Sequence, residues 1–200
     1  MVATYGEIVA HAQAEERFIR RGPIGVMAYH GGTLELLTDT IAAAVAERSD
    51  SSYYGLVQSL DPPAHFPSIS VDPALSTALA AFVEHVDVAI TIHGFGRPTM
   101  MSALLLGGTN RALAEHLAGP LRSALPAYDV VTDLEVIPRP LRGMHRRNPV
   151  NLPRRGGVQI ELPPRVRGMS PLWWDWEGEG LTPHTEALVD GLARGIRSWR

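Results

Sequence analysis

Short, almost unbroken apolar segments alternate with amphipathic segments along the whole chain. The apolar segments, which we predict to be strands, are residues 24–30, 53–60, 86–93, 102–107, 128–134 and 157–162. The amphipathic segments, which we predict to be helices, are residues 5–20, 34–48, 73–85, 110–125 and 184–199. Strands that are apolar on both faces are typical of a parallel sheet covered by helices on both sides. The pattern therefore predicts an α/β fold with three αβα layers around a mixed, largely parallel sheet.

Chain length and cysteine content narrow the possibilities further. Two hundred residues, 45% of them hydrophobic, are enough to bury one full core, so we predict a single domain over residues 1–200. The chain has no cysteine, which excludes disulfides, thiolate metal sites and cysteine nucleophiles. Any metal would have to be held by histidine, aspartate or glutamate.

The N-terminal segment is polar, with Glu7, His11, Glu15 and Glu16 in its first sixteen residues. This composition does not suit a secretory signal. No apolar run approaches the roughly 20 residues that a membrane-spanning helix needs. We therefore expect no membrane association, and a protein that stays in the cytoplasm or is released by lysis.

Positive charge is concentrated in one stretch of the sequence. All 18 basic residues are arginines, and residues 139–167 hold eight of them against one acid, a net charge of +7. Residues 1–138 carry seven arginines against fifteen acids, a net charge of −8. Because the planar guanidinium group matches carboxylates and phosphates, the arginine-rich stretch favours an anionic ligand. The alternative is a solvated loop in a protein that uses arginine in place of lysine.

Two predicted strands lead directly into His-Gly. The first ends at His30, with Glu35 five residues beyond it, and the second ends at His93. If these strands are parallel neighbours, both imidazoles and the carboxylate emerge at the same edge of the sheet, where Gly107-Gly108 is also expected. Two histidines and one carboxylate with an open position are the ligands of a catalytic zinc ion. The alternative for Glu35 is electrostatic: Thr33 would cap the next helix and place Glu35 in its first turn.

The segment 157–162 offers a further carboxylate. Its alternation puts Val158 and Ile160 on one sheet face and Gln159 and Glu161 on the other. A charged side chain on a central strand is costly unless it is paired or functional. Glu161 is therefore a candidate general base for an attacking water, and an ion pair with an arginine at position 165 or 167 is the equally weighted structural alternative.

These motifs occur together in an order that resembles one family. They are His30-Gly-Gly-Thr-Leu-Glu35, His65 with Ser68 to Pro73, His93-Gly94, Gly107-Gly108 and Gly157-Val-Gln-Ile-Glu161-Leu. Over about residues 24–167 the chain resembles the zinc-dependent poly-γ-glutamate hydrolases, first associated with bacteriophages of capsule-forming hosts. The resemblance implies a carboxypeptidase-like fold, a single catalytic domain and cleavage of the γ-amide bonds of poly-γ-glutamate.

The resemblance also assigns roles to individual residues. It makes His30, Glu35 and His93 the zinc ligands and Glu161 the catalytic carboxylate. Candidates for substrate binding are Arg165, Arg167, Arg155, Asn151 and His65. The segment Ala64-His65-Phe66-Pro67-Ser68 only approximates the corresponding His-Ile-x-Ser segment of the family, which leaves the role of His65 open.

Three functions are thus consistent with the sequence. The first is a zinc amidohydrolase with an acidic γ-glutamyl polymer or peptide as substrate, acting as a monomer without nucleic acid. The second is a zinc carboxypeptidase or amidase of cell-wall peptides. The third is a polyanion-binding protein that uses residues 139–167, in which the strand-end histidines would be incidental.

Overall fold

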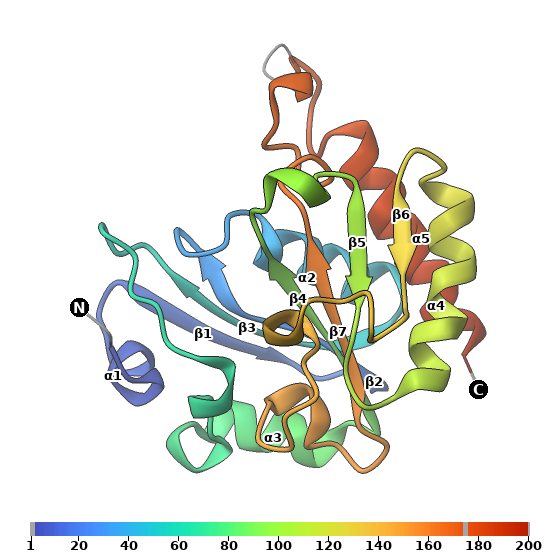
Figure 1. Cartoon of the computed structure of the whole chain (residues 1–200). Helices are drawn as coiled ribbons and strands as arrows, with labels where there is room; N and C mark the ends of the chain where they lie inside the picture. Colours follow the sequence, from blue (N-terminus) through green and yellow to red (C-terminus); the bar gives the residue numbers. More distant parts are fainter. Residues whose placement is uncertain (1–2, 174–175, 200) are drawn as a thin grey trace.

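The computed structural model, which describes residues 3–173 and 176–199, contains a seven-stranded sheet with the order β1-β3-β2-β4-β7-β5-β6 (Figure 1). The strands are β1 (Ala14–Ile19), β2 (Gly22–Gly32), β3 (Ser51–Gln58), β4 (Val88–Gly94), β5 (Ala103–Leu106), β6 (Asp129–Val131) and β7 (Gly157–Leu162). The central strands β3, β2, β4 and β7 are parallel, whereas β1 is antiparallel to β3 and β5 is antiparallel to β7. The prediction of a mixed, largely parallel sheet is therefore confirmed.

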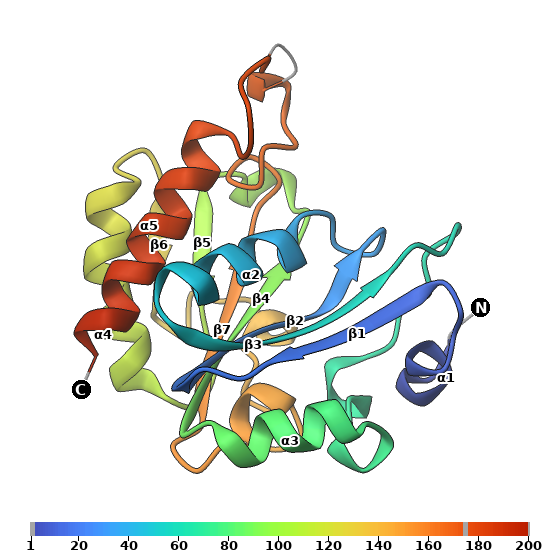
Figure 2. The same ribbon diagram turned by 180° about the vertical axis from the view of Figure 1, so that it is seen from behind.

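Helices cover both faces of this sheet, so the three predicted αβα layers are also confirmed (Figures 1 and 2). The helices are α1 (Tyr5–Val9), α2 (Thr38–Arg48), α3 (Thr77–His85), α4 (Arg111–Ala124) and α5 (Pro183–Ser198). Apolar side chains of α2, α4 and α5 pack in one core on the first face, and those of α1 and α3 pack in a second core on the other. In the described part of the chain, no helix combines the length and the apolarity that crossing a membrane requires.

The predicted helix over residues 5–20 is wrong. Only α1 is helical there, and the second half of the segment forms the edge strand β1. Burial alternates from residue to residue along β1, the period of a strand with one face on the core. Pairing with β3 and the contact between the rings of Phe18 and Phe82 outweigh the helix propensity of the alanine, glutamates and arginine in this segment.

The helix expected from residue 34 also begins later, at Thr38. The hydroxyl of Thr33 donates to the carbonyl oxygens of Gln58 and Leu60, so it does not cap a helix. Glu35 lies in the turn between β2 and α2, ahead of the first helical turn. A helix dipole therefore does not account for this carboxylate.

Strand β2 changes its pairing with β3 between Ala28 and Gly31. Up to that point β2 alternates regularly, with Met27 and Tyr29 in the core beneath α3 and Ala28 in the core beneath α2. An irregularity of this kind can re-aim a side chain at the end of a strand. Here the consecutive rings of Tyr29 and His30 both lie against the ring of His93, with centroid distances of 4.8 and 4.9 Å.

The expectation for Gly107-Gly108 is wrong. Because β5 runs antiparallel to β7, this pair lies beside the beginning of β7, at the opposite sheet edge from the end of β4. The Gly107 N–H donates to the carbonyl of Gln159, and Gly108, with φ +85°, lies against the backbone at Gly157. The two glycines thus allow close backbone packing at the entry to β7.

Candidate metal centre

Three side chains converge where β2 and β4 end. These strands are parallel neighbours, as the sequence predicts, and they bring His30 and His93 to the same sheet edge. The Nδ1 atom of His30 lies 2.9 Å from Oε1 of Glu35, and Nδ1 of His93 lies 3.1 Å from Oε2. Ligand atoms of all three residues lie within 4.8 Å of one another. The structure thus brings together the three residues predicted to hold a metal.

The second ring nitrogen of each imidazole, Nε2, also has a hydrogen-bond partner. His30 Nε2 lies 3.0 Å from the carbonyl oxygen of Phe66, which can only accept, so Nε2 donates in this contact when it carries a proton. His93 Nε2 lies 2.8 Å from the hydroxyl of Tyr29. Partners of this kind orient metal-binding histidines and leave the other ring nitrogen available. Burial lowers the pKa of His30, which favours the neutral imidazole that binds metals.

Glu35 is anchored by the backbone and by the two rings. Its own N–H donates to the carbonyl of His30, and the N–H of Gly94 donates to its Oε2 at 2.8 Å. Burial acts to raise the pKa of Glu35, but the imidazoles of His93 and His30 outweigh it and hold that pKa well below its ordinary value. The carboxylate is therefore ionised. With two imidazole nitrogens it forms a donor set that fits a zinc ion with an open coordination position.

Glu161 lies next to this cluster on the neighbouring strand. In the parallel register of β4 and β7, His93 is opposite Glu161, and Gln159 and Glu161 occupy the face away from the core that holds Val158 and Ile160. Burial raises the pKa of the Glu161 carboxyl to about 7, with His93 opposing this shift and Glu35 adding to it. A carboxyl with a pKa near neutrality can both accept and return a proton, as general acid–base chemistry requires.

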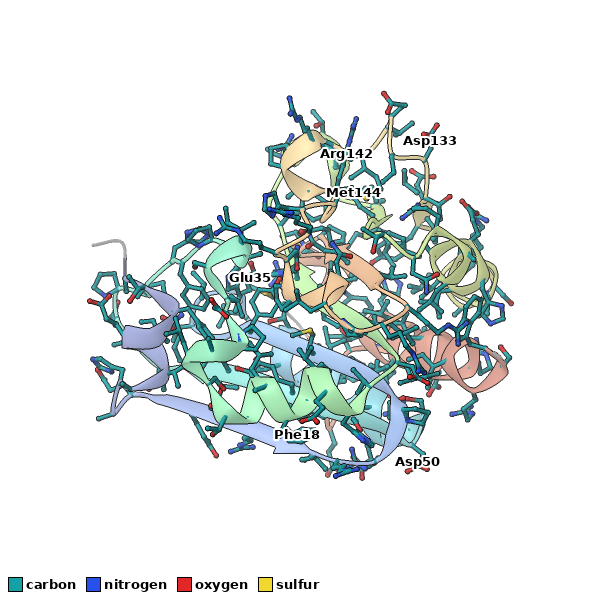
Figure 3. The ribbon with its side chains drawn as sticks, turned by 90° about the horizontal axis from the view of Figure 1, so that it is seen from below. Phe18, Glu35, Asp50, Asp133, Arg142 and Met144 are labelled. Carbon is teal, nitrogen blue, oxygen red and sulfur yellow. The ribbon has the colours of Figure 1, made fainter. Side chains whose placement is uncertain are left out.

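A cleft of about 860 Å³ opens beside the cluster. Residues 65–69 and 134–148 form its two walls, and His30 and Gln159 lie at its base. Arg139, Arg142 and His145 line the second wall, together with Glu135. Arg142 and Met144 lie close together on the segment between β6 and β7, on the opposite side of the view from Phe18 and Asp50 (Figure 3).

Two of the five predicted substrate-binding residues lie near the cluster. His65 lines the cleft, with its ring 5.6 Å from that of His30. Arg167 is only 6% exposed, and its guanidinium lies against the backbone of Gly94 and donates to the carbonyl of Leu36 at 2.7 Å.

The other three predicted substrate-binding residues lie elsewhere. Arg165 lies over the ring of Tyr128, and Arg155 lies over the ring of Trp199. Asn151 connects two segments of the backbone: its NH₂ group donates to the carbonyls of Gly143 and His145, and its amide oxygen accepts from the Thr109 hydroxyl. Before β7 begins, the chain passes to the opposite sheet edge, where Arg155 N–H donates to the carbonyl of Asp87. This path takes Arg155 away from the cleft.

Several residues around the site are not distinguished by the sequence pattern. They are Tyr29, Phe66, Arg139, Arg142, His145 and Asn148. Arg139 and Arg142 belong to the arginine-rich stretch, but nothing in the pattern separates them from its other arginines. Tyr29 depends on the irregular pairing of β2, and Phe66 contributes a backbone carbonyl, which has no sequence signature.

Solved structures with the same fold include a bacteriophage poly-γ-glutamate hydrolase, which is 18% identical (TM-score 0.75; 92% of this chain and 87% of that chain covered). YndL in its zinc-free form is 19% identical (TM-score 0.71; 94% and 91% covered). A proposed carboxypeptidase from Burkholderia mallei is 9% identical (TM-score 0.53; 97% and 66% covered).

A search among curated proteins finds no match to this sequence. The family model described as poly-gamma-glutamate hydrolase matches residues 9–171, a range that includes the His30, Glu35, His93 cluster and Glu161. Because that match spans most of the sequence, the chain belongs to the poly-γ-glutamate hydrolase family.

Proposed function

We propose that this protein is a zinc-dependent amidohydrolase that cleaves γ-glutamyl amide bonds. The observation that carries the proposal is the placement of a two-histidine, one-carboxylate donor set beside the buried carboxyl of Glu161. Membership of the hydrolase family supports the same function, and so does the similarity to YndL, whose solved structure is a zinc-free form.

Each residue of the site has a distinct task in this proposal. When bound, zinc polarises the amide carbonyl and lowers the pKa of a water from about 15.7 to about 7. His30 and His93 would hold the ion through their Nδ1 atoms, and Glu35 would hold it through its carboxylate. Glu161 accepts a proton from the attacking water at a carboxylate oxygen and passes it to the nitrogen of the leaving amine.

The walls of the cleft support an acidic substrate. Every internal residue of a γ-linked glutamate chain carries a free carboxylate, and guanidinium groups bind carboxylates with two parallel hydrogen bonds. Arg139 and Arg142 line the cleft, and the imidazoles of His65 and His145 add further donors. This arrangement favours γ-linked polyglutamate over neutral peptides.

Metal analysis and one variant test the proposal. We expect about one zinc per chain in the purified protein and shortening of poly-γ-glutamate chains. Glu161→Gln should keep its zinc and lose activity by about 10²- to 10⁴-fold, since the amide cannot take up the proton. Glu115→Gln, on the exposed face of α4, is the matched control and should behave as wild type.

Other outcomes would contradict the proposal in different ways. Protein without bound zinc that still binds polyanions would favour the polyanion-binding function. Zinc-loaded protein that cleaves cell-wall peptides and leaves the polymer intact would favour the carboxypeptidase or amidase function. Near-normal activity of the Glu161→Gln variant would remove Glu161 from its assigned role.

A further inference from the structure

A buried chain of hydrogen bonds connects the metal-site residue His93 to the candidate base Glu161. His93 Nε2 lies 2.8 Å from the Tyr29 hydroxyl, which lies 3.3 Å from Oδ1 of Asn148. Asn148 Nδ2 donates to Oε1 of Gln159 at 2.7 Å, and Gln159 Nε2 donates to Oε1 of Glu161 at 2.8 Å. Every member is at most 4% exposed. Asn148, the middle residue of this hydrogen-bond chain, belongs to the wall of the cleft.

Two backbone groups set the direction of these hydrogen bonds. The N–H of Val150 points at Oδ1 of Asn148, 3.2 Å away, and an N–H can only donate. The accepting atom of Asn148 must therefore be its oxygen, which turns its NH₂ group toward Gln159. The carbonyl of Leu141 lies 3.3 Å from Gln159 Nε2 and can only accept, which requires the same orientation of the Gln159 amide.

The direction of these hydrogen bonds determines whether the Glu161 carboxyl accepts from Gln159 or donates to it. Because the NH₂ group of Gln159 faces Glu161, Oε1 of the carboxyl accepts a hydrogen bond. Among the described residues, Gln159 is the only side chain that hydrogen-bonds the Glu161 carboxyl, and it does so at Oε1. Oε1 of Glu161 is thus held by the hydrogen bond from Gln159, and Oε2 is left to exchange a proton with the reacting groups.

The same direction determines the proton position on His93. The Tyr29 hydroxyl has a single hydrogen, and Asn148 Oδ1 can only accept it. The oxygen of Tyr29 therefore accepts from His93, which places a proton on Nε2 of His93 and makes Nδ1, on the side of Glu35, the ring atom that would bind a metal ion.

We infer that Asn148 is a positioning residue that orients both the metal ligand His93, through Tyr29, and the base Glu161, through Gln159. It is held by the cleft wall and touches neither the metal position nor Glu161 directly. The inference rests on the proposed function, because it assigns His93 and Glu161 the roles given there. It adds a residue whose amide, rather than its size, is what the site requires.

Asn148→Asp tests the requirement for the amide. The substituted carboxylate still accepts from Val150 and Tyr29, but it cannot donate to Gln159, whose amide must then turn its oxygen toward Glu161. We expect kcat at pH 8 to fall about tenfold or more, in line with the loss of a hydrogen bond to a charged group. At lower pH the introduced carboxyl gains a proton that it can donate to Gln159, so kcat relative to wild type at the same pH should recover.

Two further variants separate the two arms of the chain. Tyr29→Phe removes the acceptor for His93, and should weaken zinc binding about 10- to 100-fold in competition with a chelator. Gln159→Met removes the donor to Glu161, and should lower kcat while zinc affinity stays close to that of wild type. These two measurements test the inference even if Asn148→Asp does not fold.

Asn110→Asp is the matched control, since Asn110 caps α4 and hydrogen-bonds Arg155 at the opposite sheet edge. It should leave kcat, zinc affinity and their pH dependence unchanged. The inference is overturned if wild type binds zinc and cleaves polymer while Asn148→Asp shows a wild-type kcat at every pH. It is also overturned if Tyr29→Phe binds zinc as tightly as wild type. Wild type without zinc or without cleavage would instead overturn the proposed function.

Discussion

The contact between Gly94 and Arg167 joins three segments of the candidate metal centre. A Cβ atom built on Gly94 would lie 2.7 Å from Cζ of Arg167, so the guanidinium occupies the space that a side chain would need. Arg167 Nη1 donates to the carbonyl of Leu36, in the turn that carries Glu35, and the Gly94 N–H donates to Glu35 itself. Burial of the arginine in these contacts explains why a glycine follows His93.

Gly94→Ala should therefore disturb the candidate metal centre. The added methyl group must displace Arg167, and overpacking of this kind costs about 1–3 kcal/mol in the free energy of unfolding. We expect a lower melting temperature and weaker zinc binding, measured by thermal denaturation and by chelator competition. Gly96→Ala is the control, because no atom beyond the adjoining residues lies within 4 Å of a Cβ built there.

A double-mutant comparison identifies the cause. If the clash with Arg167 is responsible, Gly94→Ala should cost less stability in an Arg167→Met background than in wild type, since contacting residues are not additive. Equal costs in both backgrounds would show that the effect of Gly94→Ala arises elsewhere.

At the scale of elements, the end of α2 contains a residue in a conformation that favours glycine. Asp50 has φ +54° and follows the last turn of α2, and its N–H donates to the carbonyl of Glu47. Residues in this left-handed conformation commonly end helices, and glycine adopts it without a steric penalty from a Cβ atom. The Asp50 carbonyl accepts from Gly22 at the beginning of β2, so this turn also sets the start of the central strand.

Asp50→Gly should stabilise the protein by up to about 1 kcal/mol, because the steric cost of the left-handed conformation disappears. For a chain of this length, that corresponds to a rise of about 2–4 °C in the melting temperature. Asp50 lies far from Arg142 in the view of Figure 3, so hydrolysis should be unchanged. Asp50→Val should lower the melting temperature, and a result in which both variants melt alike would contradict this account.

The elements also show where sequence patterns succeed. Strands buried on both faces, such as 24–30 and 157–162, are predictable because unbroken apolar residues have few alternatives to a central parallel strand. The edge strand β1 is not predictable from the sequence, because its polar residues are compatible with a helix until β3 supplies a pairing partner. Pairing between segments distant in the chain lies outside what a local pattern records.

At the scale of the whole molecule, folding divides the arginine-rich stretch 139–167 among several environments. Arg139 and Arg142 line the cleft, Arg154 pairs with Asp87 at 2.6 Å, and Arg167 is buried. The net charge of +7 is therefore a property of the sequence rather than of one surface. We expect only the arginines of the cleft to act on an acidic substrate.

Arg139→Gln should raise KM for poly-γ-glutamate about three- to tenfold at low salt, because one exposed positive charge leaves the cleft. Added salt screens charge–charge attraction, so the difference from wild type should shrink as ionic strength rises. Steady-state kinetics at several salt concentrations measure this. Arg154→Gln removes the same charge from the same stretch of sequence, and an equal increase in its KM would refute a specific role for the cleft.

The candidate ligand set can be predicted from the sequence because each residue ends an apolar strand or closely follows one, and parallel strands end at a common edge. Glu161 can be predicted from the sequence because alternation along β7 isolates a charge that the interior would otherwise exclude. The roles of the arginines cannot be predicted from the sequence, since charge along a chain carries no information about which loops fold toward one cleft.

The order of apolar strands and the residues at their ends thus specify an α/β sheet with two histidines and two carboxylates near one edge. These features are local, and they follow from strand periodicity and the cost of burying charge. The tyrosine and the asparagine that orient His93 and Glu161, and the division of the arginines, depend on contacts between residues far apart in the chain, such as Tyr29 with Asn148. Such contacts arise only when loops pack across the sheet, because their geometry depends on tertiary packing that no sequence pattern encodes.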